Sequence, residues 1–409
     1  MRKEIFIFGI LFLILFSSGQ EIQEQATAIN IEIPVRVFKR NKFIDNLTIN
    51  DFEVFEDGKL QKIEAVYLIQ ERQVKREESE KPFYPETKKR NFVLIFEMIQ
   101  YSKNVGDGVD YFVKNVIMPG DTLILITPME RYNFDTGFPS DVPRQKISDG
   151  LRSSIKKDII KGSGEFRSLT NKLEEIRTMD VPPELKDSIE FTYAEVLEKL
   201  MELSCLQENR LIGFAESLKK IEGQKHVLLF FQRRLIPTWG SFTSTDELDN
   251  NPSYTHRFFD FYTPRTYFNM DKVTATFADS SISLNFIYVT ERLRDSSAWL
   301  SSNPRGGGSE RSLNRAIPVP TSRDGVDWQD GTVDFFNAFK EIASATGGIS
   351  DSSANVNSSL KKAAKASENY YLLYYTPKDY VADGKFRKIE VKVKGKKYKV
   401  RHRSGYIAD

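Results

Sequence analysis

The sequence has few of the residues that build the commonest catalytic and metal centres. It contains one cysteine in 409 residues, so no intramolecular disulfide can form, and its three histidines are scattered. No GxSxG, P-loop, HExxH or CxxC pattern occurs, which removes the sequence signatures of a nucleophile elbow, a phosphate loop, a zinc helix and a redox thiol pair. Cys205 lies in a leucine-rich helical stretch, and we expect a buried, inert thiol. The scarcity of cysteine and histidine and the absence of these motifs disfavour several large enzyme classes.

An excess of charge of one sign is also lacking. The chain has 59 basic and 57 acidic side chains, a formal net charge of +2, so it lacks the basic footprint of a nucleic-acid-binding protein. We expect no nucleic-acid partner. A hydrophobic content of 40% is typical of a globular protein and too high for a disordered one.

Long apolar runs are absent except at the amino terminus. Two basic residues precede a 12-residue apolar run at 5–16, and small residues follow it. This pattern predicts a secretory signal peptide over 1–19, cut before Gln20. The run is shorter than the roughly 20 residues of a membrane-spanning helix, so an uncleaved anchor is the weaker alternative. We expect an exported mature chain with no transmembrane span, periplasmic or extracellular.

Antiparallel patterns occur at both ends of the mature chain. Alternating apolar residues and a turn at Gly58 predict an N-terminal β module over 20–70, with Pro34 at a strand edge. Twelve of the 20 residues at 71–90 are charged, which predicts a linker. Residues 378–409 predict a C-terminal β-hairpin, which we expect to pack on the N-terminal module or on the edge of the main sheet.

The middle of the chain, 91–377, alternates buried strands with helices. Nearly continuous apolar runs and helical spacing predict a parallel-dominated sheet with helices on both faces. A long helical insertion at 142–223 is divided by Pro182 and Pro183, and we expect it to lie across this domain. The runs that predict buried strands are 92–96, 123–126, 227–231, 282–289 and 370–375.

Several segments, taken in order, resemble one bacterial family. They are INDFEVFEDGKLQKIEAV, FVLIFEMIQYSKN, VIMPGDTLILIT, FKEIASATGGIS and residues 370–406, from YYLLYYTPK to RSGY. Together they resemble the von Willebrand factor A-related acidobacterial domain family. The resemblance implies a three-layer, Rossmann-like α/β domain with a mainly parallel sheet. It also implies a site at the carboxyl ends of the central strands, where von Willebrand A domains hold a divalent cation through an Asp-x-Ser-x-Ser loop, a threonine and a distal aspartate.

The residues at those positions depart from the metal-binding pattern. Glu97 replaces the first aspartate, Ile99 and Tyr101 replace the serines, and Gln232 replaces the distal aspartate. Mg²⁺ prefers near-octahedral oxygen coordination, so we expect neither Mg²⁺ nor Ca²⁺, and no cofactor. Glu97 has a second interpretation as a surface carboxylate at a strand end. The candidate partner-binding residues of this degenerate site are Glu97, Ile99, Tyr101, Ser102, Asp135, Thr136 and Gln232.

These observations favour an exported, non-enzymatic protein that mediates protein–protein interaction or adhesion in the cell envelope. Its partner would be a protein or another envelope macromolecule. One alternative is an envelope hydrolase on the same fold. Another is a chaperone-like or structural module that binds exported chains by strand addition at the Pro34 edge. Two surface features also suit binding, the aromatic segment 254–268 and the basic hairpin 385–403.

Overall fold

The computed structural model describes most of the chain between residue 29 and the carboxyl terminus. The predicted signal peptide, Cys205 and the segment 254–268 lie outside the described residues. The described ranges are 29–40, 42–71, 73–79, 89–134, 142–179, 182–203, 206–232, 235–239, 269–289, 326–330, 333–353, 355–395 and 397–409.

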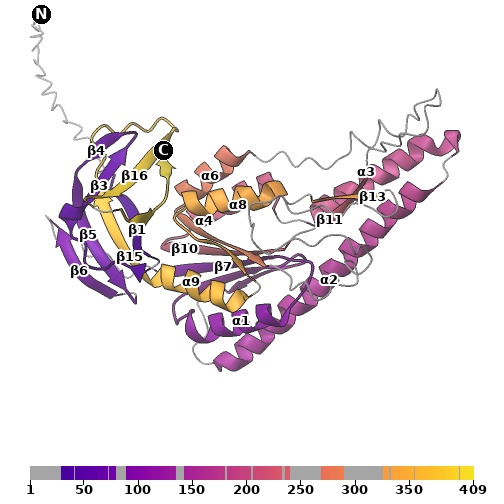
Figure 1. Cartoon of the computed structure of the whole chain (residues 1–409), viewed down its shortest axis with the longest axis horizontal. Coiled ribbons are helices and arrows are strands. Elements are labelled where there is room, and N and C mark those ends of the chain that lie inside the picture. The colour runs from indigo at the N-terminus through magenta and orange to yellow at the C-terminus, as the bar shows by residue number, and fades with distance from the viewer. Residues whose placement is uncertain are drawn as a thin grey trace, which may run out of the picture.

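One end of the molecule is a β unit built from both ends of the chain (Figure 1). It contains two antiparallel sheets. A six-stranded sheet has the order β17-β1-β15-β5-β6, with β2 added to β1, and a four-stranded sheet has the order β18-β16-β3-β4. Their bounds are β1 Ile31–Lys39, β2 Lys42–Phe43, β3 Phe52–Glu56, β4 Lys59–Gln61, β5 Ile63–Gln70, β6 Gln73–Ser79, β15 Asn369–Tyr375, β16 Phe386–Val393, β17 Lys399–Arg401 and β18 Gly405–Ile407, with the short 3-10 helix η1 at Ile49–Asp51.

Strand β15 lies in the middle of the larger sheet. Leu373 is opposite Ile33 of β1 on one side and Val66 of β5 on the other. Because side chains alternate along a strand, β15 contributes to two separate apolar clusters. Tyr371, Leu373 and Tyr375 join the cluster of the β unit, while Tyr370, Leu372 and Tyr374 pack with residues of β5 on the opposite face. Both faces of β15 are therefore buried.

The middle of the chain forms an α/β unit around a mixed six-stranded sheet. Its order is β14-β12-β10-β7-β8-β9; the first five strands are parallel and β9 is antiparallel. Helices α1, α9 and the start of α2 cover one face, and α4, α6 and α8 cover the other. The bounds are β7 Arg90–Glu97, α1 Lys103–Asn115, β8 Thr122–Ile126, β9 Arg131–Phe134, α2 Arg144–Thr178, α4 Glu208–Lys219, β10 Gln224–Phe231, α6 Met270–Asp279, β12 Ile282–Val289, α8 Val333–Ala345, β14 Ser350–Ser353 and α9 Val356–Glu368.

The expected fold class, a mainly parallel three-layer domain with small antiparallel modules at its ends, is wrong for this chain. Of the four sheets in the described residues, three are antiparallel throughout and the fourth is mixed. The run at 370–375 was expected to be the last strand of the parallel sheet. It forms β15 of the β unit instead, because its partners are β1 and β5.

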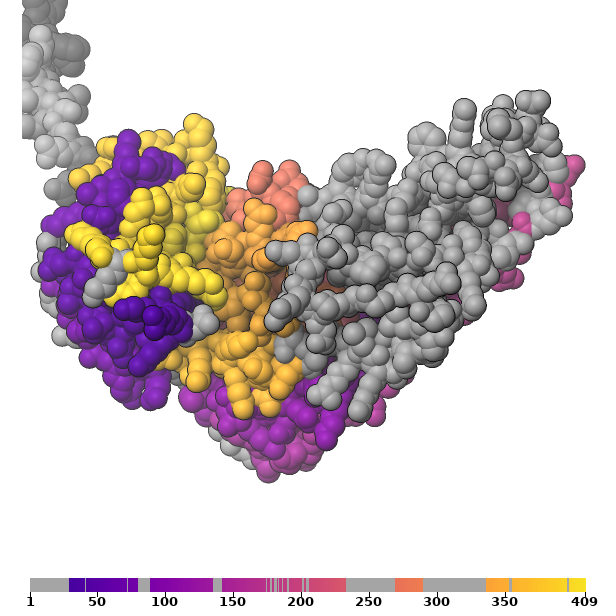
Figure 2. Space-filling model, viewed as in Figure 1, coloured from indigo at the N-terminus to yellow at the C-terminus, as the bar shows by residue number. Residues whose placement is uncertain are grey.

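The two ends of the chain pack together as one β structure. Val391 of β16 pairs with Val54 of β3, so the C-terminal segment packs on the N-terminal module as expected. The expected hairpin itself does not form, because β16 pairs with β3 and β18 while β17 pairs with β1 in the other sheet. The expected linker at 71–90 contains an ordered edge strand, β6, whose Val74 pairs with Ile69. In the space-filling view the β unit and the α/β unit meet along a continuous boundary (Figure 2).

The far part of α2 and helix α3 (Lys186–Glu202) form an arm that extends away from the sheet, rather than lying across the domain as expected (Figure 1). The start of α2 and α4, which also belong to the predicted insertion, pack on the sheet. Helix α2 has 35 residues, so at 1.5 Å per residue it is about 50 Å long. The 3-10 helix η2 (Pro183–Leu185) separates it from α3, which confirms the predicted break at the two prolines. Apolar side chains between the helices hold the arm together: Leu173, Ile176, Tyr193, Val196, Leu197 and Leu200.

Two further strands complete the described chain. Strands β11 (Leu235–Trp239) and β13 (Val326–Asp330) form a two-stranded antiparallel sheet beyond β10.

None of the helices in the described ranges combines the length and the apolar character needed to cross a bilayer.

A buried ion pair fixes the start of β7 to the turn after α1. Arg90 Nη2 lies 2.6 Å from Asp121 Oδ2, and both side chains are almost fully buried. The guanidinium also donates to the carbonyl oxygen of Val116, and Asp121 accepts the backbone N–H of Met118. The pair therefore connects the strand, the end of α1 and the turn into β8.

We expect Asp121→Asn to lower the free energy of unfolding by about 3 kcal/mol, because the Arg90 charge stays buried without its counter-charge. Urea unfolding followed by circular dichroism measures the change. The control is Asp379→Asn, which removes the exposed ion pair with Lys59 and should change stability by less than about 0.5 kcal/mol. Equal effects of the two variants would contradict this account of the pair.

Candidate functional site

The carboxyl ends of β7 and β10 meet at one edge of the mixed sheet. Glu97 pairs with Phe231 in the parallel register, and the backbone N–H of Gln232 donates to the carbonyl oxygen of Glu97 at 2.9 Å. The structure therefore brings together Glu97 and Gln232, the two residues that the sequence placed at the ends of the central strands.

The Gln232 side chain is used to hold the turn that follows β7. Its Oε1 accepts the backbone N–H of Gln100 at 2.9 Å and that of Ile99 at 3.2 Å. The side chain is buried, so an acceptor without charge suits the position, because a buried unpaired charge is costly. Gln232 thus supports the turn from within.

Glu97 is not a surface carboxylate at a strand end, which was the second interpretation of its place in the sequence. The residue is 1% exposed, and it lies under the turn that Gln232 holds. Burial of a carboxylate requires polar partners or protonation. In this position Glu97 is part of the interior at the strand ends and offers little surface to a partner.

The other loop residues are turned toward α1. Tyr101 lies over Gly106, where an added Cβ would be 2.5 Å from the phenol oxygen and 3.2 Å from Arg152 Nε. Ser102 precedes the first turn of α1, and its carbonyl oxygen accepts the N–H of Val105 at 3.1 Å. Asp135 and Thr136 lie outside the described residues.

Sequence reasoning missed a second polar group near this edge. Thr127 follows β8, and its hydroxyl donates to Asp158 of α2 at 2.8 Å. Tyr132 of β9 donates to the same carboxylate oxygen at 2.8 Å. Burial of the phenol and the hydrogen bond to Asp158 raise the pKa of Tyr132 to about 12. Thr127 was recognisable as the first polar residue after an apolar strand, but the separation of 31 positions from Asp158 hid their contact.

Among the described residues, the side chains at the strand ends offer a poor donor set for a divalent cation. Ile99 has no side-chain oxygen, Tyr101 lies over α1, and the oxygen of Gln232 already accepts two N–H groups. Within the described ranges, no three His, Cys, Asp or Glu side chains are close enough together to hold a metal ion. The hydrogen bonds of Gln232 stabilise the loop between β7 and α1.

We expect Gln232→Leu to lower the free energy of unfolding by about 2 kcal/mol, because two backbone N–H groups lose their buried acceptor. Amide hydrogen exchange at Ile99 and Gln100 should become faster than in the wild type. The matched control is Gln145→Leu on the exposed start of α2, for which exchange in this turn should not change. Unchanged exchange in Gln232→Leu would show that the side chain does not hold the turn.

Comparison with known proteins gives no family for the chain. No family model matches the sequence, and no curated protein matches it. Among solved structures, the chain is similar to the human COPII-coat protein Sec24c, with 6% sequence identity and a TM-score of 0.26. The aligned part covers 78% of this chain and 44% of that chain, so this chain spans less than half of that protein. At this TM-score the similarity carries no argument about fold or function.

Proposed function

We propose that this chain is a non-enzymatic binding protein that engages another protein through the far end of the α2–α3 arm. The observation that carries the proposal is the exposure of three large apolar side chains there. Met179 is 49% exposed, Leu185 53% and Phe191 73%. Single exposed apolar residues are ordinary on a protein surface, whereas a group of large ones at the end of one projection is typical of an interaction site.

The arm does not need these side chains for its own stability. Its interior is filled by other residues, among them Leu173, Tyr193 and Leu197. Phe191 lies on the same helix as Tyr193 but is exposed where Tyr193 is buried. Exposed aromatic residues are the type of residue that anchors protein interfaces.

The charge of α3 favours a protein partner over a lipid surface. The helix carries five acidic and two basic residues, so anionic lipid head groups would repel it. A partner with an apolar patch bordered by basic side chains would match both the exposed apolar groups and the charge. The predicted export of the chain would place this partner in the cell envelope.

The strand ends support the non-enzymatic part of the proposal. Glu97 is buried, and the amide of Gln232 holds a turn rather than facing solvent. The alternative of strand addition requires a free edge at Pro34 of β1. On one side of Pro34, Leu372 of β15 is its strand partner, and Pro34 also lines a cavity between the two units. We therefore place recognition on the arm and propose that it needs no cation or cofactor.

The test is site-specific photo-crosslinking in envelope extract, with the crosslinker at Phe191 in one variant and at Val381, 58% exposed on the β unit, in the other. The partner captured only from Phe191 is purified, and its affinity for the full chain is measured by calorimetry. We expect Phe191→Ser to weaken binding at least about tenfold, because exposed aromatic anchors carry a large share of interface energy. Val381→Ser and added EDTA should leave the affinity unchanged.

Three results would overturn the proposal. An affinity that survives both Phe191→Ser and Leu185→Ser would move recognition away from the arm. Loss of binding in EDTA would show that a cation takes part. Turnover of an envelope polymer by the purified chain would favour the hydrolase alternative instead.

A further inference from the structure

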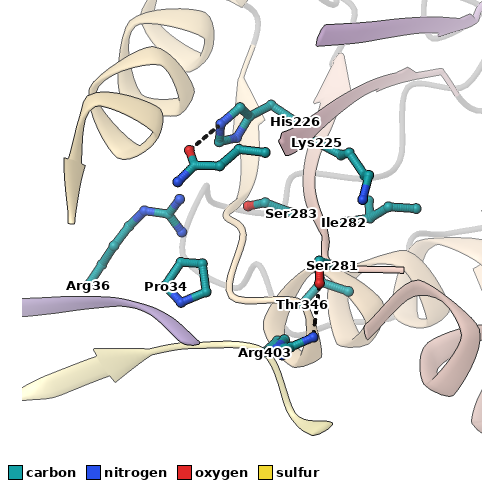
Figure 3. Close-up of a pocket in the computed structure, with 10 residues that line it drawn as sticks. Pro34, Arg36, Lys225, His226, Ser281, Ile282, Ser283, Thr346 and Arg403 are labelled. Carbon is teal, nitrogen blue, oxygen red and sulfur yellow. Dashed lines mark hydrogen bonds between the residues drawn. The ribbon is translucent and has the colours of Figure 1, made fainter. Parts of the chain in front are cut away.

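A small cavity lies between the β unit and the amino ends of the strands of the mixed sheet (Figure 3). It faces away from the strand ends discussed above, because the lining residues of β10 and β12 come from the start of each strand. Its volume is about 30 Å³, close to the share of one molecule in liquid water. The lining residues are Pro34, Arg36, Gln224, Lys225, His226, Ser281, Ile282, Ser283, Thr346 and Arg403.

The lining is cationic and rich in hydroxyl groups. Arg36 and Arg403 reach it from the β unit, and Lys225 reaches it from β10 (Figure 3). Ser281, Ser283 and Thr346 add hydroxyls, and none of the described lining residues is acidic. Groups that donate hydrogen bonds and carry positive charge, gathered around one small hollow, are complementary to an anion.

Among the described residues, both guanidinium groups donate their hydrogen bonds to uncharged acceptors. Arg36 donates only to the carbonyl oxygens of Ala366 and Gly347, and Arg403 donates to Ser281 Oγ at 2.9 Å and to the carbonyl oxygen of Glu32 at 2.8 Å. Neither forms an ion pair with a described carboxylate, and the buried Nε of Arg403 has no hydrogen-bond partner there. Cations buried against neutral acceptors alone are costly.

The nearest carboxylates are already engaged. Glu32 accepts the Tyr374 hydroxyl at 2.9 Å, and Asp279 lies 2.8 Å from Lys219. Burial lowers the pKa of Arg36 to about 10, and it also lowers the pKa of Arg403. Both shifts have the sign expected of cations that would gain from a nearby negative charge.

The backbone at Ser281, beside the cavity, is strained. Ser281, which lines the cavity and accepts from Arg403, has a φ of +54°. A non-glycine residue in this region costs free energy, and such residues gather at ligand sites. The positive φ aligns the turn before β12 with the arginines of the β unit.

We infer that this cavity binds a monatomic anion of the chloride class between Arg36 and Arg403. The small volume favours a monatomic ion over phosphate and larger oxyanions. The bound anion would connect the β unit to the α/β unit, because Arg36 belongs to β1, while Ser281 precedes β12 and Ser283 lies at its start. The inference is independent of the proposed function of the arm.

Bromide serves as the probe, since it replaces chloride and scatters anomalously. In crystals of the full chain grown with bromide, we expect an anomalous peak within hydrogen-bond distance of Arg36 or Arg403. In solution, bromide and chloride should raise the unfolding temperature by about 3 °C with a saturating dependence, relative to gluconate at equal ionic strength.

Ser283→Leu fills the cavity without removing a charge, and we expect it to weaken the halide dependence at least tenfold. The control is Ser217→Leu on the exposed side of α4, which should keep the full halide response. Two results would overturn the inference: bromide crystals with water alone in the cavity, or halide and gluconate curves that coincide in the wild type. The crystallographic result stands even if Ser283→Leu folds poorly.

Discussion

The position of β15 between β1 and β5 is the constraint on which the rest of the structure depends. The strand follows α9 directly, so the chain must leave the α/β unit and enter the middle of the β unit within one residue. Main-chain pairing on both sides and burial of both faces make this insertion strongly specified. The α/β unit is therefore inserted between two halves of one β structure.

This arrangement gives the mixed sheet two different ends. Its amino ends face the β unit across a tight joint, where Arg36 and Arg401 donate to the carbonyl oxygens of Gly347 and Gly348. A Cβ at Gly347, whose φ is +72°, would lie 2.9 Å from the backbone of His402 in the β unit, so the joint favours a residue without a side chain here. Its carboxyl ends lie on the side from which the arm extends (Figure 1). The anion cavity and the proposed recognition surface thus occupy opposite ends of the sheet.

The sequence predicted the buried strands well and their sheets poorly, for a physical reason. A continuous apolar run such as 370–375 indicates burial on both faces, and a central antiparallel strand meets that condition as well as a parallel one. The edge strand at Gln73–Ser79 was hidden because its residues are polar and charged. At the strand ends, the family resemblance implied that Glu97 and Gln232 follow the two central strands. It could not show that Glu97 is buried or that Gln232 accepts two backbone N–H groups, since both depend on how the loop folds back.

The account's central claim is that recognition takes place at the far end of the arm and not at the strand ends. Amide hydrogen exchange of the full chain, measured with and without its purified partner, tests it most directly. The account predicts slower exchange on binding around Met179 and along the first turns of α3 to Phe191, with no change between Glu97 and Asn104. Protection confined to Glu97–Asn104, with the arm unchanged, would contradict it.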